Sequence, residues 1–453
     1  MGIITFSVSV FLFSFSIVLF KNKPLSPMAL FYGLWSFILF LSLFHFYGIY
    51  PPTEEAYFLI FLMLVFFFIG NFIMYFSKAA LGKKIRIHKK NRNSGTSIMI
   101  KSVLFYCLVG CCIFFTVLDC IVVINALFSK TPIWVIRSWK MAAYGSSNPM
   151  LDRRSFFEEV FRTVILDPFG TLIPPVTAYY FFHPRKDKKR FIMLGLSLIY
   201  LLLSSFAGGG GRLGYIYYFG CFLLGYLTMS NRKAFPSFKK GKYRKYITVV
   251  LIFGIVAVVL FTRFRTGSGN FIKQTYTYFA LSPTLLGLWL NDLGEVVHTN
   301  GFLTFFGVHS YVFRIFETIG WEHMIPEIYE ISYQCMLDAE KFRQVGYGVA
   351  NAFVTPLYYF FIDGGYPFVC LASTVFGGIV SKFHKAFIGK TEISLRSFAI
   401  YVLIMYGVFL TFIRIQTCTP SYVISFAMAY FILDKTDHSN LFPKMEESIN
   451  AES

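Results

Sequence analysis

Long apolar runs separated by short polar breaks fill the chain from its first residues to near its end. A helix needs about 20 residues to cross the hydrocarbon core of a bilayer, and most of these runs approach or exceed that length. The pattern predicts eleven membrane-spanning helices, at residues 2–20, 27–50, 56–76, 102–128, 160–182, 191–206, 213–229, 247–262, 366–381, 393–413 and 417–433. The expected fold class is therefore an all-α polytopic membrane protein.

One connection is much longer than the others and runs from residue 263 to 365. Long loops are usually functional, and two stretches of this one, 275–297 and 311–321, have helical periodicity with aromatic surfaces. That pattern is typical of helices lying in the membrane interface. We therefore expect four parts: helices one to eight with short loops in 1–262, a large outer loop with interfacial helices in 263–365, helices nine to eleven in 366–433, and a tail in 434–453.

The composition agrees with a membrane protein and excludes other classes. Hydrophobic residues make up 56% and charged residues 14% of the 453 residues, whereas soluble proteins carry about 25% charged residues. A soluble protein of this composition would expose a large apolar surface to water. The aromatic content of 20% excludes a disordered chain. No basic segment precedes the first apolar run, which predicts a membrane span rather than a cleaved signal peptide.

The formal net charge of +19 indicates membrane topology rather than nucleic-acid binding. Alternate connections, together with the C-terminal tail, hold 27 of the 42 Lys and Arg residues, and the opposite connections hold 14. Because cytoplasmic loops carry the excess of Lys and Arg, we expect the N-terminus outside and the C-terminus in the cytoplasm. The basic clusters at 83–92 and 239–246 are expected to touch anionic membrane lipids, and no nucleic acid is expected as a partner.

Arginines on the outer side are candidates for binding pyrophosphate or sugar. In FAGGGGRLGY (206–215), four glycines precede Arg212 at the start of a helix, and such a turn presents N–H groups and a positive dipole to an anion. A flexible turn with an interfacial arginine is the alternative. Arg263 and Arg265 stand where a helix leaves the membrane, and anchoring by snorkelling is the alternative for either one. Arg314 and Arg343 of the outer segment are further candidates, and Arg414 is a further outer arginine at the end of the tenth expected span.

The outer segment also holds side chains suited to acid–base work and to sugar contacts. The candidates for a general base are His309, Glu317 and Asp363, which the sequence does not rank. A lone histidine is more often a structural hydrogen-bonding residue than a base. Tyr276 and Tyr278 have rings that can stack on sugars, although structural packing is the more frequent role of such rings. The sequence lacks zinc, P-loop and nucleophile-elbow motifs, so neither a metal nor a cofactor is expected.

Two acidic residues, Asp119 and Asp167, fall inside predicted spans. Ionisable residues within a membrane are costly, and this marks both as functional candidates. Asp167 stands in the sequence DPFG beside a proline break, so helix capping explains it equally well.

The segment GYGVANAFVTPLYYFFIDGGYPFVCLASTVFGGIVSKF (346–383) resembles the oligosaccharide repeat-unit polymerases, the Wzy-type O-antigen polymerase family. In that family an Asn or Ser precedes Phe-x-Thr, tyrosines follow, and Asp-Phe-Gly leads into a helix with small residues. The matching residues here are Asn351, Phe353, Thr355, Tyr358, Tyr359, Asp363, Gly364 and Gly365, with glycine in place of the phenylalanine. The GGGGR turn is similar to the same family. Some members carry an Arg-x10-Gly pattern in two outer loops, but no Arg in 129–160 or 263–365 of this sequence has a Gly eleven residues on.

The resemblance implies an integral-membrane glycosyltransferase of GT-C-like architecture in the bacterial inner membrane. Its donor would be polymer on undecaprenyl pyrophosphate, its acceptor a single lipid-linked repeat unit, and its product an O-antigen or capsule-type polysaccharide. An acceptor hydroxyl would attack the anomeric carbon, and undecaprenyl pyrophosphate would leave. A flippase and a chain-length regulator are the protein partners that it implies. An O-antigen ligase and a lipid-linked oligosaccharide flippase or carrier are the alternatives, and a carrier should show a repeat symmetry that is not visible here.

Overall fold

The computed structural model of the chain is almost entirely helical. The described residues are 1–19, 26–77, 95–131, 135–136, 155–182, 189–208, 213–230, 271–294, 297–351, 353–388 and 393–433. Their α-helices are α1 (Gly2–Leu19), α2 (Pro27–Ser42), α3 (Glu54–Phe76), α4 (Gly95–Phe128), α6 (Phe156–Phe161), α7 (Asp167–Phe182), α8 (Lys189–Ala207), α9 (Leu213–Ser230), α11 (Phe271–Asp292), α12 (Phe306–Thr318), α13 (Glu327–Ala339), α14 (Thr355–Ile388), α15 (Leu395–Phe409) and α16 (Pro420–Ile432). The shorter elements are η1 (Phe46–Gly48), the π-helical η3 (Arg162–Leu166), η4 (Glu322–Met324), β1 (Arg343–Gln344), β2 (Val349–Ala350), η5 (Leu410–Phe412) and η6 (Gln416–Cys418).

These helices overlap ten of the eleven expected spans, although α2 ends at Ser42, before the expected end at residue 50. Among the described residues, six helices are long and apolar enough to cross a membrane, by length and composition, and they come from α1, α3, α4, α8, α14 and α15 with η5. Three shorter apolar helices come from α2, α9 and α16, and α6, η3 and α7 together cover the expected span at 160–182. The expected span at 247–262 lies outside the described residues. The all-α membrane fold class is thus supported, while the count of eleven stays a prediction.

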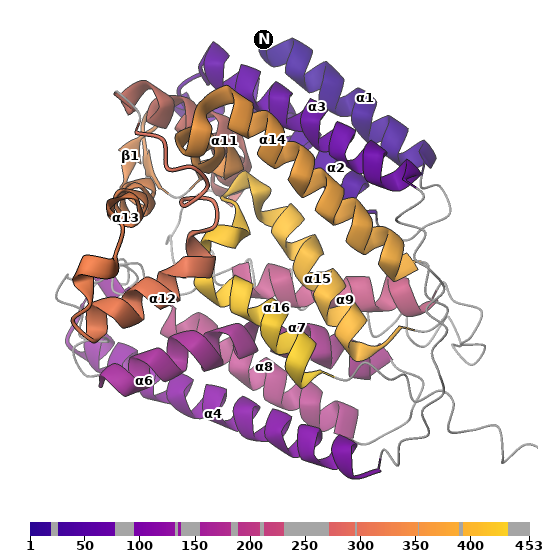
Figure 1. Cartoon of the computed structure of the whole chain (residues 1–453), viewed down its shortest axis with the longest axis vertical. Coiled ribbons are helices and arrows are strands. Elements are labelled where there is room, and N and C mark those ends of the chain that lie inside the picture. The colour runs from indigo at the N-terminus through magenta and orange to yellow at the C-terminus, as the bar shows by residue number, and fades with distance from the viewer. Residues whose placement is uncertain are drawn as a thin grey trace, which may run out of the picture.

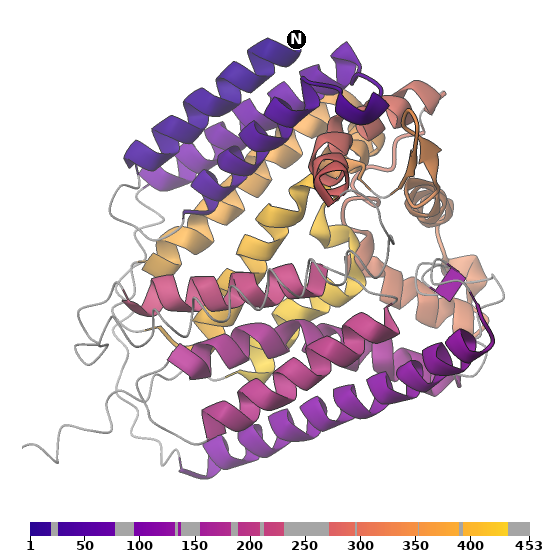
Figure 2. The same cartoon turned by 180° about the vertical axis from the view of Figure 1, so that it is seen from behind.

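The helices form two groups that α15 and α16 join (Figure 1). In one group α14 packs along α3 and α1 packs on α2, and in the other α4 packs on α8 and α7 on α9. Helix α15 contacts α2 and α14 of the first group and α7 of the second. Figure 2 shows the same arrangement from behind, with α12 and α13 in orange at one side of the molecule. The segment that contains α11, α12 and α13 therefore lies at one end of the bundle.

Helix α7 shows how the second group accommodates a break in helical hydrogen bonding. Pro174 and Pro175 lie inside this helix, and a proline has no N–H to donate to the carbonyl four residues before it. The carbonyl of Thr171 therefore loses its partner in the helix. Tyr217 of α9 replaces that partner, because its hydroxyl donates to the Thr171 oxygen over 2.8 Å. One tyrosine thus joins α9 to α7 at the proline pair.

Replacing Tyr217 by phenylalanine should destabilise the protein by about 1–3 kcal/mol, because a buried carbonyl is left without a donor. The expected result is a lower melting temperature in detergent, followed by tryptophan fluorescence. Tyr347→Phe is the matched control, since the Tyr347 side chain is 92% exposed. If Tyr217→Phe had the same melting temperature as the wild type, the Thr171 carbonyl would have another hydrogen-bond donor.

The outer segment differs from the expectation where α14 begins. This helix starts at Thr355, well before residue 366, where the span was expected to begin. Gly364 and Gly365 interrupt it with non-helical backbone, and Gly365 has a φ of 62°, a conformation that favours glycine. The glycine pair suggested a helix start, but the chain is helical and largely buried on its N-terminal side as well. The boundary at residue 365 is therefore a kink within one long helix.

Helix α12 has two different faces. One face carries apolar side chains that are about half exposed, at i, i+3 and i+4 spacing: Phe305 just before the helix, Val308, Val312, Ile315 and Ile319 just after it. The other face packs on the protein, where Phe306 is buried. An exposed apolar stripe of this kind suits a helix that lies in the membrane interface.

Candidate functional site

The backbone between α15 and α16 leaves the α-helical conformation at residues 410–419, which we call the link. It contains the short turns η5 and η6. Its sequence is rich in Thr and Ile, which are stiff at χ1 and weaken a helix, and Pro420 disfavours the α conformation in the residue before it. Thr411, Phe412 and Cys418 of the link are fully buried. Non-helical backbone of this kind is tolerated in a membrane protein where it is buried in protein or lines a cavity.

Neighbouring elements supply hydrogen bonds to the link. The Thr355 N–H at the start of α14 donates to the Ile413 carbonyl over 2.9 Å. The Thr417 hydroxyl donates to the Thr304 carbonyl of the outer segment over 2.7 Å. Helix α12 approaches so closely that a Cβ on Gly307 would lie 2.6 Å from the Thr417 oxygen. The link is thus enclosed by α14 and by the start of α12.

Arg414 is the charged residue of the link, and its guanidinium forms an ion pair with Glu340 at the end of α13. The two side chains are 22% and 27% exposed. The Asn351 amide donates to the Glu340 carbonyl over 2.9 Å, and Tyr359 is close enough to Arg414 to interact with its charge. Two residues of the family-like segment 351–365 thus lie near this pair, Asn351 at the backbone of Glu340 and Tyr359 near the Arg414 charge. From the sequence, Arg414 is one outer arginine among several, and Glu340 is not a candidate site residue.

Asp363 is fully buried and its carboxylate accepts three hydrogen bonds. The donors are the Thr299 hydroxyl at 2.5 Å, the Leu303 N–H at 3.1 Å and the Thr304 N–H at 2.9 Å. The Asp363 carbonyl also accepts from the Asn300 N–H over 2.9 Å. This aspartate therefore fastens the turn before α12 to the kink of α14, and the geometry assigns it a positioning role rather than that of a base.

His309 lies on α12 within a set of aromatic rings. The ring centres of Phe302, Phe306, Phe313 and Tyr329 are 4.8–5.9 Å from its own. Its Nε2 atom is buried and makes no hydrogen bond to the described residues. Burial lowers the pKa of His309 from its ordinary value, and the negative charge of Asp363 opposes that shift. The imidazole is thus neutral near pH 7, with one nitrogen free.

The other candidates from the sequence are not brought together with His309. Glu317 is exposed on α12, and Arg314 belongs to the same helix. Arg343 in β1 forms an ion pair with Asp292, and its guanidinium lies 3.9 Å from the centre of the Trp289 ring. Arg212, Arg263 and Arg265 lie outside the described residues, so their convergence on a pyrophosphate stays a prediction.

The two candidate tyrosines are engaged in packing. The Tyr276 hydroxyl donates to the Leu41 carbonyl over 3.0 Å and accepts from the Phe46 N–H over 2.9 Å. The Tyr278 ring packs against Phe353 and Phe412, with ring centres 4.9 and 5.8 Å apart. These contacts fix α11 to its neighbours and leave the Tyr276 hydroxyl no further role in the site.

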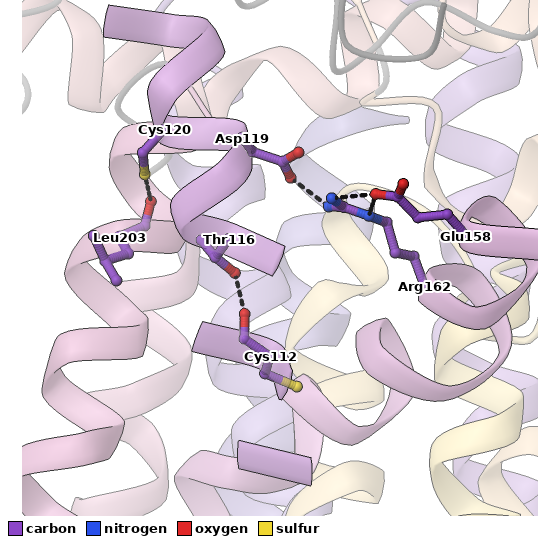
Figure 3. A network of polar contacts seen from close by, with 7 residues as sticks. All are labelled: Cys112, Thr116, Asp119, Cys120, Glu158, Arg162 and Leu203. Carbon is purple, nitrogen blue, oxygen red and sulfur yellow. Dashed lines mark hydrogen bonds and ion pairs between the residues drawn. The ribbon is translucent and has the colours of Figure 1, made fainter. Parts of the chain in front are cut away.

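A buried network that the sequence reading missed surrounds Arg162 (Figure 3). Its guanidinium pairs with Asp119 of α4 over 2.9 Å and with Glu158 of α6 over 2.7 Å, and it lies 4.8 Å from the centre of the Phe115 ring. Arg162 is 8% exposed. The i,i+4 spacing of Glu158 and Arg162, with an acid inside a neighbouring span, is the signal that could have found it.

The π-helical segment η3 begins at this arginine. The Asp167 N–H bonds to the Arg162 carbonyl, five residues back along the chain. Within the same segment the Thr163 carbonyl accepts from the Tyr311 hydroxyl of α12 over 2.9 Å. Segments of this kind often occur at functional sites. Helix α12 therefore touches both the link and η3, and so connects the two groups of helices.

The described residues hold no group of three or more His, Cys, Asp or Glu side chains placed to bind a metal ion. Comparisons of the chain with protein-family models, with curated proteins and with solved structures find no match.

Proposed function

We propose that the protein polymerises lipid-linked oligosaccharide repeat units on the outer face of the bacterial inner membrane. This proposal rests on the residues that lie near Arg414. Asn351 and Tyr359 match the Wzy-type pattern; Asn351 bonds the Glu340 carbonyl and Tyr359 lies close enough to Arg414 to interact with its charge. A cation beside a segment of this pattern suits a reaction in which pyrophosphate departs.

The reaction transfers polymer from undecaprenyl pyrophosphate to the lipid-linked repeat unit. A hydroxyl of the acceptor attacks the anomeric carbon of the donor, the bond from that carbon to the pyrophosphate oxygen breaks, and the hydroxyl proton passes to a base. The outer segment with α12 and α13 would shield the sugar from water, which competes with the acceptor. Arg212, Arg263 and Arg265 remain the further candidates for the pyrophosphate.

Of the three candidate bases, His309 suits the role best. Asp363 is occupied by three hydrogen bonds, and Glu317 is exposed to solvent. His309 has a buried, unbonded Nε2, and a base needs a free lone pair within reach of the proton that it takes.

His309→Gln should lower the polymerisation rate by about 10²–10⁴-fold, the usual contribution of a general base, while the melting temperature stays near that of the wild type. Since burial lowers the pKa of His309, the imidazole is neutral above about pH 6.5, and the acid limb of the pH–rate profile should lie below that value. Both effects are measured with purified protein and lipid-linked repeat units. An unchanged acid limb in His309→Gln would assign the base elsewhere; Glu317→Gln is the control.

The phenotype of a deletion strain tests the proposed function directly. Loss of a polymerase should leave a single repeat unit on the surface glycolipid, which a gel of that glycolipid shows as one band above the core. Loss of a ligase should leave no repeat unit, and loss of a flippase or carrier should leave lipid-linked units on the cytoplasmic side. Either of these results would reject the polymerase. A plasmid copy of the wild-type gene should restore the ladder of long polymers.

We also propose that the N-terminus and the segment 263–365 face outward and that the C-terminus is cytoplasmic. The division of Lys and Arg between the two sides supports this orientation. A phosphatase fused at residue 300 should be active and one fused at residue 240 inactive. The reverse pattern would invert the orientation and remove every residue discussed above from the outer face.

A further inference from the structure

The ion pair between Arg414 and Glu340 joins the link to the end of α13. Arg414 belongs to the link, which is held by α14 and the start of α12. Glu340 belongs to the end of α13, whose buried side chains are only Ser332 and Ala339. Both charged side chains are partly exposed, at 22% and 27%. The pair is therefore only partly exposed, and its arginine belongs to a segment whose neighbouring residues are buried.

Arg414 also differs in the number of its partners from Arg162 and Arg343, two other outer arginines. Arg162 meets two carboxylates and a phenyl ring, and Arg343 meets one carboxylate and the face of Trp289. Among the described residues, Arg414 forms an ion pair with one carboxylate. A guanidinium has five N–H donors, of which one carboxylate uses at most two. Arg414 thus keeps donors that an anion with more oxygens would use.

We propose that Arg414 binds the diphosphate group of a lipid-linked sugar, and that Glu340 takes the place of this group when no ligand is bound. The choice of a lipid-linked diphosphate rests on the proposed function. Carboxylate and phosphate oxygens accept from a guanidinium with the same fork geometry, so the two compete for one position. When diphosphate binds, Glu340 leaves Arg414 and the end of α13 separates from the link. Ligand binding thereby breaks the ion pair between the end of α13 and the link.

Competition of this kind has a signature that a purely structural ion pair lacks. Removing the charge of Glu340 should tighten diphosphate binding, because the ligand no longer displaces a carboxylate. Glu340→Gln should bind up to about fivefold more tightly than the wild type, the factor that corresponds to a partly exposed ion pair. Arg414→Gln should bind at least tenfold more weakly, and Arg414→Lys should fall between, since lysine keeps the charge and loses the fork.

The probes are inorganic pyrophosphate and a C55 polyprenyl diphosphate, titrated by calorimetry into purified full-length protein in detergent, with inorganic phosphate as the weaker reference. Binding of both diphosphates, or of the lipid-linked form alone, in the predicted order of variants supports the proposal. Unchanged or weaker binding in Glu340→Gln overturns it, and so does unchanged binding in Arg414→Gln. Glu317→Gln is the matched control, because it removes an exposed carboxylate of the same segment.

A second measurement uses only the wild-type protein and so does not depend on the folding of any variant. Pyrophosphate should increase hydrogen–deuterium exchange at the end of α13, over residues 336–344, and leave exchange in α3 unchanged. Slower exchange at 336–344 would mean that the ligand tightens this contact, which contradicts displacement of Glu340. The outcome is separate from that of the deletion strain: a carrier phenotype with the predicted order of affinities would reject the polymerase and keep the diphosphate site.

Discussion

Arg162→Leu is expected to destabilise the protein by about 3–5 kcal/mol, because it leaves two carboxylates without their shared cation in a buried position. The carboxylates are those of Asp119 and Glu158, both of which contact the guanidinium (Figure 3). Thermal unfolding in detergent should show a large fall in melting temperature, and much of the protein should aggregate on size-exclusion chromatography. Arg162→Lys should lie between, since a single ammonium cannot serve both carboxylates with fork geometry.

Two further variants separate the loss of charge balance from the loss of packing. The triple variant with Asp119→Asn and Glu158→Gln added to Arg162→Leu should regain a large part of the lost stability, because no uncompensated charge remains. Lys130→Leu is the surface control, since Lys130 is exposed at the end of α4. If the triple variant were no more stable than Arg162→Leu, packing of the arginine on Phe115 would be the main contribution of this residue.

Asp363→Ala is expected to cost at least about 3 kcal/mol, because three donors lose a charged acceptor inside the protein. The affected turn leads into α12, so the loss should also raise hydrogen exchange in α12 itself. Asp363→Asn should be destabilised as well, since its amide nitrogen must face at least one of those donors. The measurements are the melting temperature and hydrogen exchange of the purified variants.

The same variants decide between a positioning role and a catalytic role for Asp363. A base that is replaced by asparagine loses activity with little change in stability, whereas a positioning residue loses both together. An Asp363→Asn protein that melts with the wild type and fails to polymerise would return Asp363 to the candidates for the base. Glu317→Ala provides the control for both measurements and is expected to change stability by less than about 0.5 kcal/mol, as an exposed substitution.

The spans were predictable from the sequence because burial in a membrane requires about 20 apolar residues in a row, and that requirement is visible without knowing any contact. The expected spans at 2–20 and 213–229 agree with α1 and α9 to within one residue at each end. The start of α14 was missed because Gly364 and Gly365 suggested the end of a loop. In the protein the same glycines form a kink, and Thr355 opens the helix nearer to the link.

The site was less predictable, because its pairs join residues that are far apart in the chain. His309 and Asp363 were recognised as candidates from their residue types, but their different roles depend on contacts with Phe302 and Thr299 that no spacing reveals. Arg414 was noted as an outer arginine, but its ion pair with Glu340 was not predicted. Nothing in the local sequence relates the end of α13 to the end of α15. Tyr276 has an aromatic ring suited to sugars, yet its hydroxyl forms hydrogen bonds with the backbone of η1 and α2.

The π-helical segment η3 has a consequence for how the chain can change in length. A π turn accommodates one more residue than an α turn and keeps the register of the helix on either side, whereas one residue removed from a regular helix rotates everything beyond it by about 100°. A single-residue deletion within 164–166 would therefore convert η3 to an α-helix and keep α6 and α7 on their present neighbours. What would change is the Thr163 carbonyl, which would turn back into the helix and release Tyr311. A change of one residue in η3 would thus remove the hydrogen bond between α12 and the second group of helices while leaving the helices of that group in place.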